Sequence, residues 1–253
     1  MDKVLVLREP NGPLDVPLVC GEAYKDQDVV WKNNGQSTSY VGNQLTVRVE
    51  EMMAGNFSCH LRRDGSYLNH TLILVQPSPN EKNTLLENQS ESSDTPQHIL
   101  CSGHNYSGSF SCRWIKKNWN AAVLLVKAER NSTAIACEVE ADGSGARCNE
   151  RSCEKHEERH FIDFSVYIYR NARLDVYSRV FFLRDIVSPG RVTNLRVEGE
   201  RFLWEEPESW EKPCSFYQLQ FEVKRVPKEA SCQAPALKED KNTGAPWGEY
   251  SEL

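Results

Sequence analysis

The sequence predicts an all-β protein made of several sandwich domains, and three observations support this prediction. Short apolar runs alternate with turn sequences such as Asn33-Asn34-Gly35 and Arg63-Asp64-Gly65. No long stretch has the apolar period of about 3.6 residues that marks an amphipathic helix. Nine cysteines occur in 253 residues, several of them at short and regular spacings. A chain of this length accommodates two or three domains of ordinary size.

The composition excludes several function classes. A hydrophobic content of 39% with 26% charged residues is that of a globular chain. The formal net charge of −6 disfavours general nucleic-acid binding, which needs clustered Lys and Arg to neutralise phosphates. The sequence has no apolar run of about 20 residues, so we expect no membrane insertion.

Cysteines and glycosylation motifs together favour a secreted, extracellular protein. Many cysteines are typical of an oxidising compartment. Five Asn-x-Ser/Thr sequons are candidate N-glycosylation sites: Asn56, Asn69, Asn88, Asn105 and Asn131. The strand-like run Val4–Leu7 follows Met1 almost at once, with no apolar stretch of signal-peptide length. We therefore expect that the leader is missing from this sequence.

Residues 1–78 are predicted to form an immunoglobulin-like domain. Cys20, Trp31 and Cys59 have the Cys…Trp…Cys order of that fold, in which a disulfide joins two sheets and the indole packs on it. Leu45, Val47 and Val49 alternate with polar residues, as in a half-buried strand. By the same alternation Phe57 and Cys59 point inward, which leaves Asn56 on the outer face. Residues 79–96 are polar and are predicted to be a linker.

Residues 97–188 contain two pairs of cysteines with equal spacing. Cys101 and Cys112 are separated by ten residues, and so are Cys137 and Cys148. Two antiparallel strands joined by a short turn bring such cysteines to disulfide distance, so we predict both pairs as disulfides. Trp114 lies two residues after Cys112 and has the same parity, so its indole is expected in the core.

Two disulfide hairpins followed by C-x-W resemble the first fibronectin type III domain of class I cytokine receptors. Within that class, three segments resemble the interleukin-12 beta subunit family, which is shared with interleukin-23. They are Asn105-Tyr106-Ser107-Gly108 before Phe110-Ser111-Cys112, Phe181–Val187 leading to Pro189, and Trp204-Glu205-Glu206-Pro207 with Trp210. The resemblance covers nearly the whole chain in the same order.

Residues 189–253 are predicted to be a second, shortened fibronectin type III-like domain. Strands are expected at Asn194–Val197, Arg201–Trp204 and Phe216–Lys224, and only about 65 residues are present where such a sandwich needs about 100. The end of the chain, Trp247-Gly248-Glu249-Tyr250-Ser251, resembles the W-S-x-W-S box of the receptor family with two substitutions. In that box an indole stacks on arginine side chains.

The resemblance implies a partner and the residues that meet it. The partner is a four-helix-bundle alpha chain of the interleukin-12 or interleukin-23 type, held at the elbow between the two fibronectin-type domains. Cys153 corresponds to the cysteine that forms the interchain disulfide to that chain. Partner-facing candidates are Tyr106, Glu157, Phe216 and Tyr217. Because strand neighbours point to opposite faces, at least one of Phe216 and Tyr217 is expected to be exposed or in contact.

Metal binding and catalysis fit the sequence less well than this interpretation. Cys148, Cys153, His156 and His160 have a spacing compatible with zinc, but zinc needs both thiols reduced and the disulfide pattern opposes that. Ser102 with His98 and His104 near Cys101 does not amount to a catalytic triad, and no G-x-S-x-G, H-E-x-x-H or phosphate loop occurs. We expect no enzyme activity, no metal and no cofactor. The remaining cysteines, Cys214 and Cys232, either pair with each other or stay free.

The sequence therefore predicts a cytokine subunit that forms a heterodimer with a helical alpha chain and engages cell-surface receptors. One alternative is a soluble alpha-type or decoy receptor, which shares the architecture but needs no interchain disulfide. A second alternative is a cell-adhesion protein of the immunoglobulin type, which does not need the two disulfide hairpins.

Overall fold

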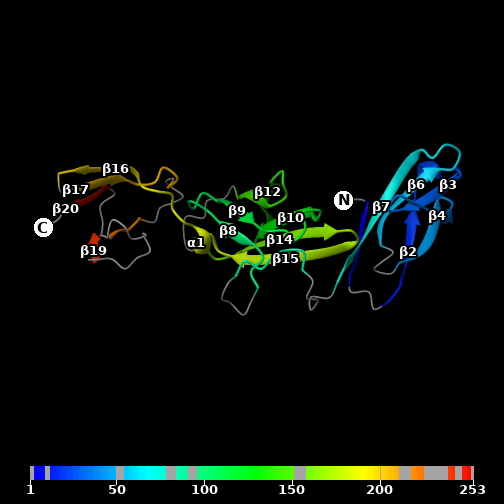
Figure 1. Ribbon diagram of the computed structural model, residues 1–253, viewed down its shortest axis with the longest axis horizontal. Coiled ribbons are helices and arrows are strands. Elements are labelled where there is room, and N and C mark those ends of the chain that lie inside the picture. The colour runs from blue at the N-terminus through cyan, green and yellow to red at the C-terminus, as the bar shows by residue number, and fades with distance from the viewer. Residues whose placement is uncertain are drawn as a thin grey trace.

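The chain consists almost entirely of strands, which form two hydrophobic cores and a smaller third unit, arranged end to end (Figure 1). The computed structural model describes residues 3–8, 12–49, 54–77, 84–90, 96–150, 158–199, 201–210, 218–224, 239–242 and 247–251. In this part of the chain the only helices are the 3-10 turn η1 (Glu22–Tyr24) and the short α1 (Leu183–Ile186). The prediction of an all-β fold is confirmed.

The first core lies between two sheets. One sheet pairs β2 (Leu14–Val19) with β5 (Gln44–Val49). The other has the order β7-β6-β3-β4, with β7 at Tyr67–Gln76, β6 at Gly55–Leu61, β3 at Val29–Asn33 and β4 at Gln36–Val41. The parallel strand β1 (Val4–Arg8) adds to the outer side of β7.

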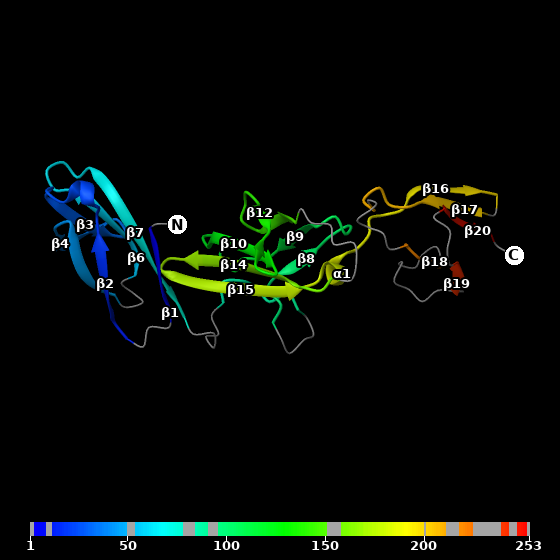
Figure 2. The ribbon, with the colours of Figure 1, turned by 180° about the vertical axis from the view of Figure 1, so that it is seen from behind.

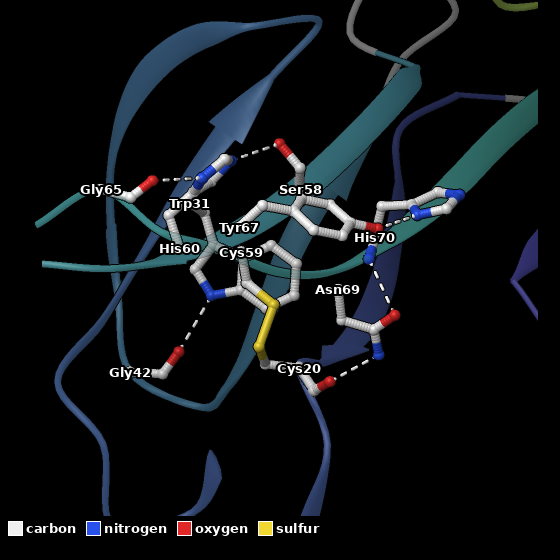
Figure 3. Close-up of a disulfide and its surroundings, with 10 residues drawn as sticks. All are labelled: Cys20, Trp31, Gly42, Ser58, Cys59, His60, Gly65, Tyr67, Asn69 and His70. Atoms are coloured by element: carbon white, nitrogen blue, oxygen red, sulfur yellow. Dashed lines mark hydrogen bonds between the residues drawn. A yellow bond between two sulfur atoms is a disulfide. The ribbon is translucent and has the colours of Figure 1, made fainter. Parts of the chain in front are cut away.

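A disulfide and an indole occupy the centre of this core (Figure 3). Cys20 is joined to Cys59, and Trp31 is buried beside them with 1% of its surface exposed. The indole N–H of Trp31 donates to the carbonyl of Gly42 at 2.9 Å, so the ring is satisfied although it is buried. The predicted alternation is confirmed, because Phe57 is buried and Asn56 is exposed.

The second core also lies between two sheets. One has the order β12-β13-β9-β8 and the other has the order β11-β10-β14-β15. Ile162, Phe164, Val166 and Ile168 alternate along β14 and are all fully buried. The bounds are β8 Leu100–Ser102, β9 Ser109–Arg113, β10 Ala122–Arg130, β11 Thr133–Ala134, β12 Ala136–Val139, β13 Gly145–Asn149, β14 Ile162–Arg170 and β15 Arg173–Phe181.

Both hairpin disulfides join residues that are directly opposite each other in neighbouring strands. Cys101 pairs with Cys112 between β8 and β9, and Cys137 pairs with Cys148 between β12 and β13. The Cα atoms are 4.0 Å apart in each pair. Trp114 follows β9 and is 2% exposed, as its parity predicts, and its indole N–H donates to Gly143.

Part of the predicted linker, residues 79–96, belongs to the second core, which corrects that prediction for residues 84–90. Leu85 and Leu86 are buried in this core, and Leu86 forms a bridge with Lys116 beyond β9. The backbone N–H groups of both leucines donate to the hydroxyl of Tyr177, at 2.7 and 3.1 Å. The segment is polar in composition, but its two adjacent leucines are part of the second core.

The first and second cores share one continuous sheet of nine strands. The end of β7 meets the start of β15, where Val75 pairs with Arg173 in a parallel bridge. Ala172, in the turn between β14 and β15, packs against the first core. Backbone pairing therefore joins the two cores across the predicted domain boundaries at 78 and 96.

The third unit is built on β16 (Thr193–Glu198), β17 (Arg201–Glu205) and β20 (Trp247–Ser251), in that order. A separate ribbon pairs β18 (Phe221–Lys224) with β19 (Glu239–Asn242). Trp204 is 6% exposed and meets the ring of Phe221 edge-on at 5.6 Å. No helix in the described residues is long and apolar enough to cross a membrane.

Candidate partner-binding elbow

The loop between β8 and β9 joins the second core to the chain that enters the third unit. Gly103 donates its N–H to Ile186 at 3.0 Å and accepts from the N–H of Ser188 at 2.8 Å. A Cβ at Gly103 would lie 3.3 Å from the carbonyl of Ser109, so a side chain would be crowded there. Figure 2 shows α1 at the end of β15, where the chain passes toward β16 and β17.

Asn105 connects this loop to the turn at 207–210, which follows β17. Its side chain is 8% exposed, and its Nδ2 donates to the carbonyl of Ser209 at 2.7 Å. Its Oδ1 accepts from the N–H and the hydroxyl of Ser107, at 2.9 and 2.6 Å. The Ser209 hydroxyl in turn accepts from the N–H of Gly190 at 3.3 Å. The elbow is therefore a set of satisfied polar contacts between three segments.

Tyr106 packs within the elbow. Its ring is half-buried and meets Trp210 edge-on, with centroids 5.8 Å apart. Trp210 is 7% exposed. Its backbone N–H donates to the carbonyl of Pro207 at 2.9 Å, and this bond closes the turn that carries Trp210. Tyr106 thus contributes to the shape of the elbow as well as to its surface. The other predicted contact residues, Glu157, Phe216 and Tyr217, lie outside the described residues.

An open groove of about 930 Å³ runs from the elbow over the outer face of the sheet β12-β13-β9-β8. Alternate residues of the strands point into it, because the other set, including Phe110 and Cys112, faces the core. The groove carries side chains of both charges, and Asn105 and Ser209 belong to its lining. Its outward-facing lining includes Ser111, Arg113, Glu138, Arg147 and Asn149.

A buried ionic network lies in the second core, next to α1 and the loop between β8 and β9. Arg130, at the end of β10, is 4% exposed and pairs with Glu150 at 2.9 Å and with Glu158 at 3.0 Å. Glu158 also accepts the N–H groups of Leu183 and Arg184, which begin α1. Glu150 and Glu158 flank the segment 151–157, which contains Cys153. One arginine therefore holds both ends of that segment.

The predicted interchain cysteine, Cys153, lies outside the described residues, as do Cys214 and Cys232. The zinc alternative loses a ligand, because the sulfur of Cys148 is bonded to Cys137 and is not available as a thiolate. Among the described residues no group of three or more His, Cys, Asp or Glu side chains is placed to hold a metal ion.

The residues considered for catalysis are not brought together. The hydroxyl of Ser102 lies 3.4 Å from that of Ser111, and His104 contacts the carbonyl of Ser188. His98 lies against the ring of Tyr177, with centroids 4.9 Å apart. Each side chain has a structural partner of its own.

The residues of the W-S-x-W-S-like end, Trp247 to Ser251, form strand β20, whose backbone pairs with β17.

The five sequons differ in how their amides are placed. Asn56, Asn88 and Asn131 are exposed. Asn69 lies opposite Cys59 in the β6–β7 register, and its Nδ2 donates to the carbonyl of Cys20 at 2.6 Å (Figure 3). Asn105 is buried in the elbow, as described above. In the folded chain the amides of Asn69 and Asn105 are therefore both engaged by backbone carbonyls.

Sequence reasoning missed Arg130, Ser209 and the structural role of Asn105. Arg130 is a single charge in an ordinary strand, and nothing in its neighbourhood marks it as buried. In the sequence Asn105 belongs to a sequon and to the segment that resembles the interleukin-12 beta family, and neither predicts a role at the elbow. Its bond to Ser209 joins residues 104 positions apart, which no local pattern reveals.

The sandwich units, the hairpin disulfides and the closed elbow define an all-β protein of immunoglobulin-like and fibronectin type III-like units. The family model for the C-terminal part of interleukin-12p40, a cytokine, matches residues 96–170. The chain is similar to interleukin-12 subunit beta of Felis catus, with 27% identity over 242 residues, covering 85% of this chain and 72% of the relative. The identity to interleukin-12 subunit beta of Mesocricetus auratus is 28% over 234 residues, covering 82% of this chain and 70% of that protein. The identity to interleukin-12 subunit beta of Homo sapiens is 26% over 239 residues, covering 84% of this chain and 72% of that protein. The chain is thus similar over most of its length to interleukin-12 beta subunits, which are cytokine subunits.

Proposed function

We propose that the chain is a secreted, non-enzymatic cytokine subunit that binds a four-helix-bundle alpha chain at its elbow. The heterodimer, with an alpha chain of the interleukin-12 or interleukin-23 type, engages a cell-surface cytokine receptor. Cys153 forms the interchain disulfide. The domains at 1–78, 97–188 and 189–253 are part of this proposal, with residues 84–90 assigned to the second domain.

The closed elbow is the observation that carries the proposal. Asn105, Tyr106, Ser209 and Trp210 hold two sandwich units at one angle before any partner arrives. A preorganised surface loses less conformational freedom on binding, which favours affinity. The groove of mixed charge, whose lining includes Asn105 and Ser209, extends this surface along the second unit.

The two residues that flank the segment 151–157, which contains Cys153, support the covalent link. Glu150 and Glu158 are both held by buried Arg130. The ends of the segment are therefore anchored on the side of α1, which leads into the elbow. A partner that docks at the elbow would come within reach of this segment.

The test is co-expression with an interleukin-12 alpha or interleukin-23 alpha chain in a secretory cell line. We expect a heterodimer in the medium that survives denaturation without reductant. Cys153→Ser should convert it to a complex that separates on denaturing gels but still co-purifies under native conditions. A covalent dimer that persists in Cys153→Ser would contradict the role given to Cys153.

The binding surface is tested separately by charge reversal in the groove. Arg113→Glu with Arg147→Glu is expected to weaken capture of the alpha chain at least about tenfold, since mismatched charges at an interface are costly. Lys127→Glu is the matched control, because Lys127 is exposed on β10 in the opposite sheet. Equal loss in both proteins would place the binding surface elsewhere.

The alternative, a decoy receptor, shares the sandwich architecture and the groove. It predicts reversible capture of a free helical cytokine and no covalent dimer with any alpha chain. Gel analysis of the wild-type complex under non-reducing conditions therefore distinguishes the two functions.

A further inference from the structure

The side-chain nitrogen of Asn105, Nδ2, is both a hydrogen-bond donor in the elbow and the atom to which an N-glycan would be attached. In the folded chain Nδ2 donates to Ser209 and fixes the elbow. The tripeptide Asn105-Tyr106-Ser107 is also an N-glycosylation sequon, and a glycan would be attached to that same Nδ2.

Asn105 is buried and its amide nitrogen faces another segment of the chain. The residue is 8% exposed, and its Nδ2 faces the turn that carries Ser209 and Trp210. The hydroxyl of Ser107, which a sequon needs, is itself bonded to Oδ1 of Asn105. A glycan replaces one of the two hydrogens of Nδ2, and its first sugar would compete for space with the turn at 207–210 and with the contact between Tyr106 and Trp210.

The order of synthesis exposes Asn105 before this lock can form. Ser209 follows Asn105 by 104 residues in the chain. At about 5–20 residues per second, about 5–20 seconds pass between their emergence. Asn69 differs, because its partner Cys20 precedes it by 49 residues and is already present when Asn69 emerges.

We infer that glycosylation of Asn105 and closure of the elbow exclude each other, so that sugar occupancy at this residue decides which form of the joint a molecule adopts. An unmodified chain closes the elbow through Asn105. A chain glycosylated at Asn105 during synthesis keeps the turn at 207–210 undocked. The consequence for the alpha chain, weaker capture by the glycosylated form, rests on the function proposed above, whereas the exclusion itself does not.

The experiment compares three full-length variants secreted from the same cells. Ser107→Ala removes the sequon but keeps the Asn105 amide. Asn105→Asp removes the sequon and replaces the donor by an acceptor of the same shape. Ser107→Thr keeps a hydroxyl and strengthens the sequon. Site occupancy is read from peptide mass, and the elbow is read from hydrogen exchange of the backbone amides of Gly190 and Trp210.

We expect Ser107→Ala to protect both amides, and Asn105→Asp to exchange at least about tenfold faster, because a buried carbonyl loses its donor. Glycosylated Ser107→Thr should exchange as Asn105→Asp does. Amides of β9 and β13 serve as an internal control and should be protected equally in all three proteins.

Two results would overturn the inference. One is a glycosylated Asn105 in a chain whose elbow amides are as protected as those of Ser107→Ala. The other is an unmodified Asn105 in all secreted Ser107→Thr, which would show that the residue is not accessible during synthesis. Both readouts are independent of any partner, so failure of the proposed function leaves them interpretable.

Discussion

Val75 donates its backbone N–H to the carbonyl oxygen of Ala172 at 2.7 Å, and this bond joins the first core to the second. The bond continues the sheet from β7 into β15, where Val75 pairs with Arg173. The two cores are thus held at a fixed angle by sheet pairing, in addition to the chain that connects them.

Ala172→Asp is expected to open this junction while leaving both cores folded. The methyl group of Ala172 packs on the first core, and a carboxylate there would have to be desolvated or move to solvent. We expect a larger radius of gyration by small-angle scattering. Asn171→Asp adds the same charge one residue earlier, at an exposed turn position with φ of 55°, and should leave the radius unchanged. An unchanged radius in Ala172→Asp would show that the junction does not depend on this contact.

Arg130→Met should strongly destabilise the second core. It leaves Glu150 and Glu158 buried without their cation, a loss of about 3–5 kcal/mol in the free energy of unfolding. Adding Glu150→Gln and Glu158→Gln should restore much of that loss, because the uncompensated charges are then gone. Urea unfolding followed by fluorescence measures both effects. Arg147→Met, which removes an exposed ion pair with Glu140, should cost at most about 1 kcal/mol.

Tyr177→Phe should destabilise the chain by about 1–3 kcal/mol at neutral pH, because the N–H of Leu86 loses its acceptor. Tyr67→Phe, at an exposed tyrosine, is the control and should change stability by less than about 0.5 kcal/mol. Unfolding midpoints in urea report both.

The same tyrosine predicts a loss of stability at alkaline pH. Burial raises the pKa of Tyr177, and its bond to the Asp175 carboxylate adds to this. The folded chain therefore keeps the proton beyond the ordinary pKa of about 10, at which the unfolded chain releases it. Its contribution is complete below about pH 10 and is lost as the pH rises further. The difference in stability between wild type and Tyr177→Phe should shrink above about pH 10, and a constant difference would contradict this account.

Among the other sequons, Asn56, Asn88 and Asn131 are expected to carry glycans and Asn69 is expected to remain unmodified. Peptide mass after enzymatic deglycosylation in heavy-oxygen water measures each site. Asn69→Asp should also cost about 0.5–1.5 kcal/mol, because the carbonyl of Cys20 loses its donor. Asn88→Asp should not, because its Oδ1 accepts from Ser90 and Gln97 and an aspartate oxygen can replace it.

Local pattern was enough to predict much of the fold. Cys101 and Cys112, like Cys137 and Cys148, are 11 positions apart, and the register of a single hairpin decides whether they meet. The alternation of Phe57 and Asn56 follows from strand geometry alone. The expected strands at Asn194–Val197 and Arg201–Trp204 correspond to β16 and β17 for the same reason.

The polar segment 79–96 shows where such reasoning ends. Its composition predicted a linker, but the side chains of Leu85 and Leu86 pack in the second core. Their backbone N–H groups are satisfied there by the hydroxyl of Tyr177, about 90 positions away in the chain. The sequence shows two adjacent leucines in a polar stretch. It does not show which residues they pack against.

By itself the sequence determined which faces of the strands are apolar, which hairpin cysteines can meet and which family the chain resembles, because these depend on neighbouring residues. Only the tertiary structure decided that Asn105 fastens the elbow to Ser209 and that Arg130 anchors both ends of the segment around Cys153. Arg130 meets Glu150 and Glu158 only when the second sandwich has formed, and Asn105 meets Ser209 only when the chain beyond β17 has packed against it. Both sets of contacts therefore depend on residues that are distant in the sequence.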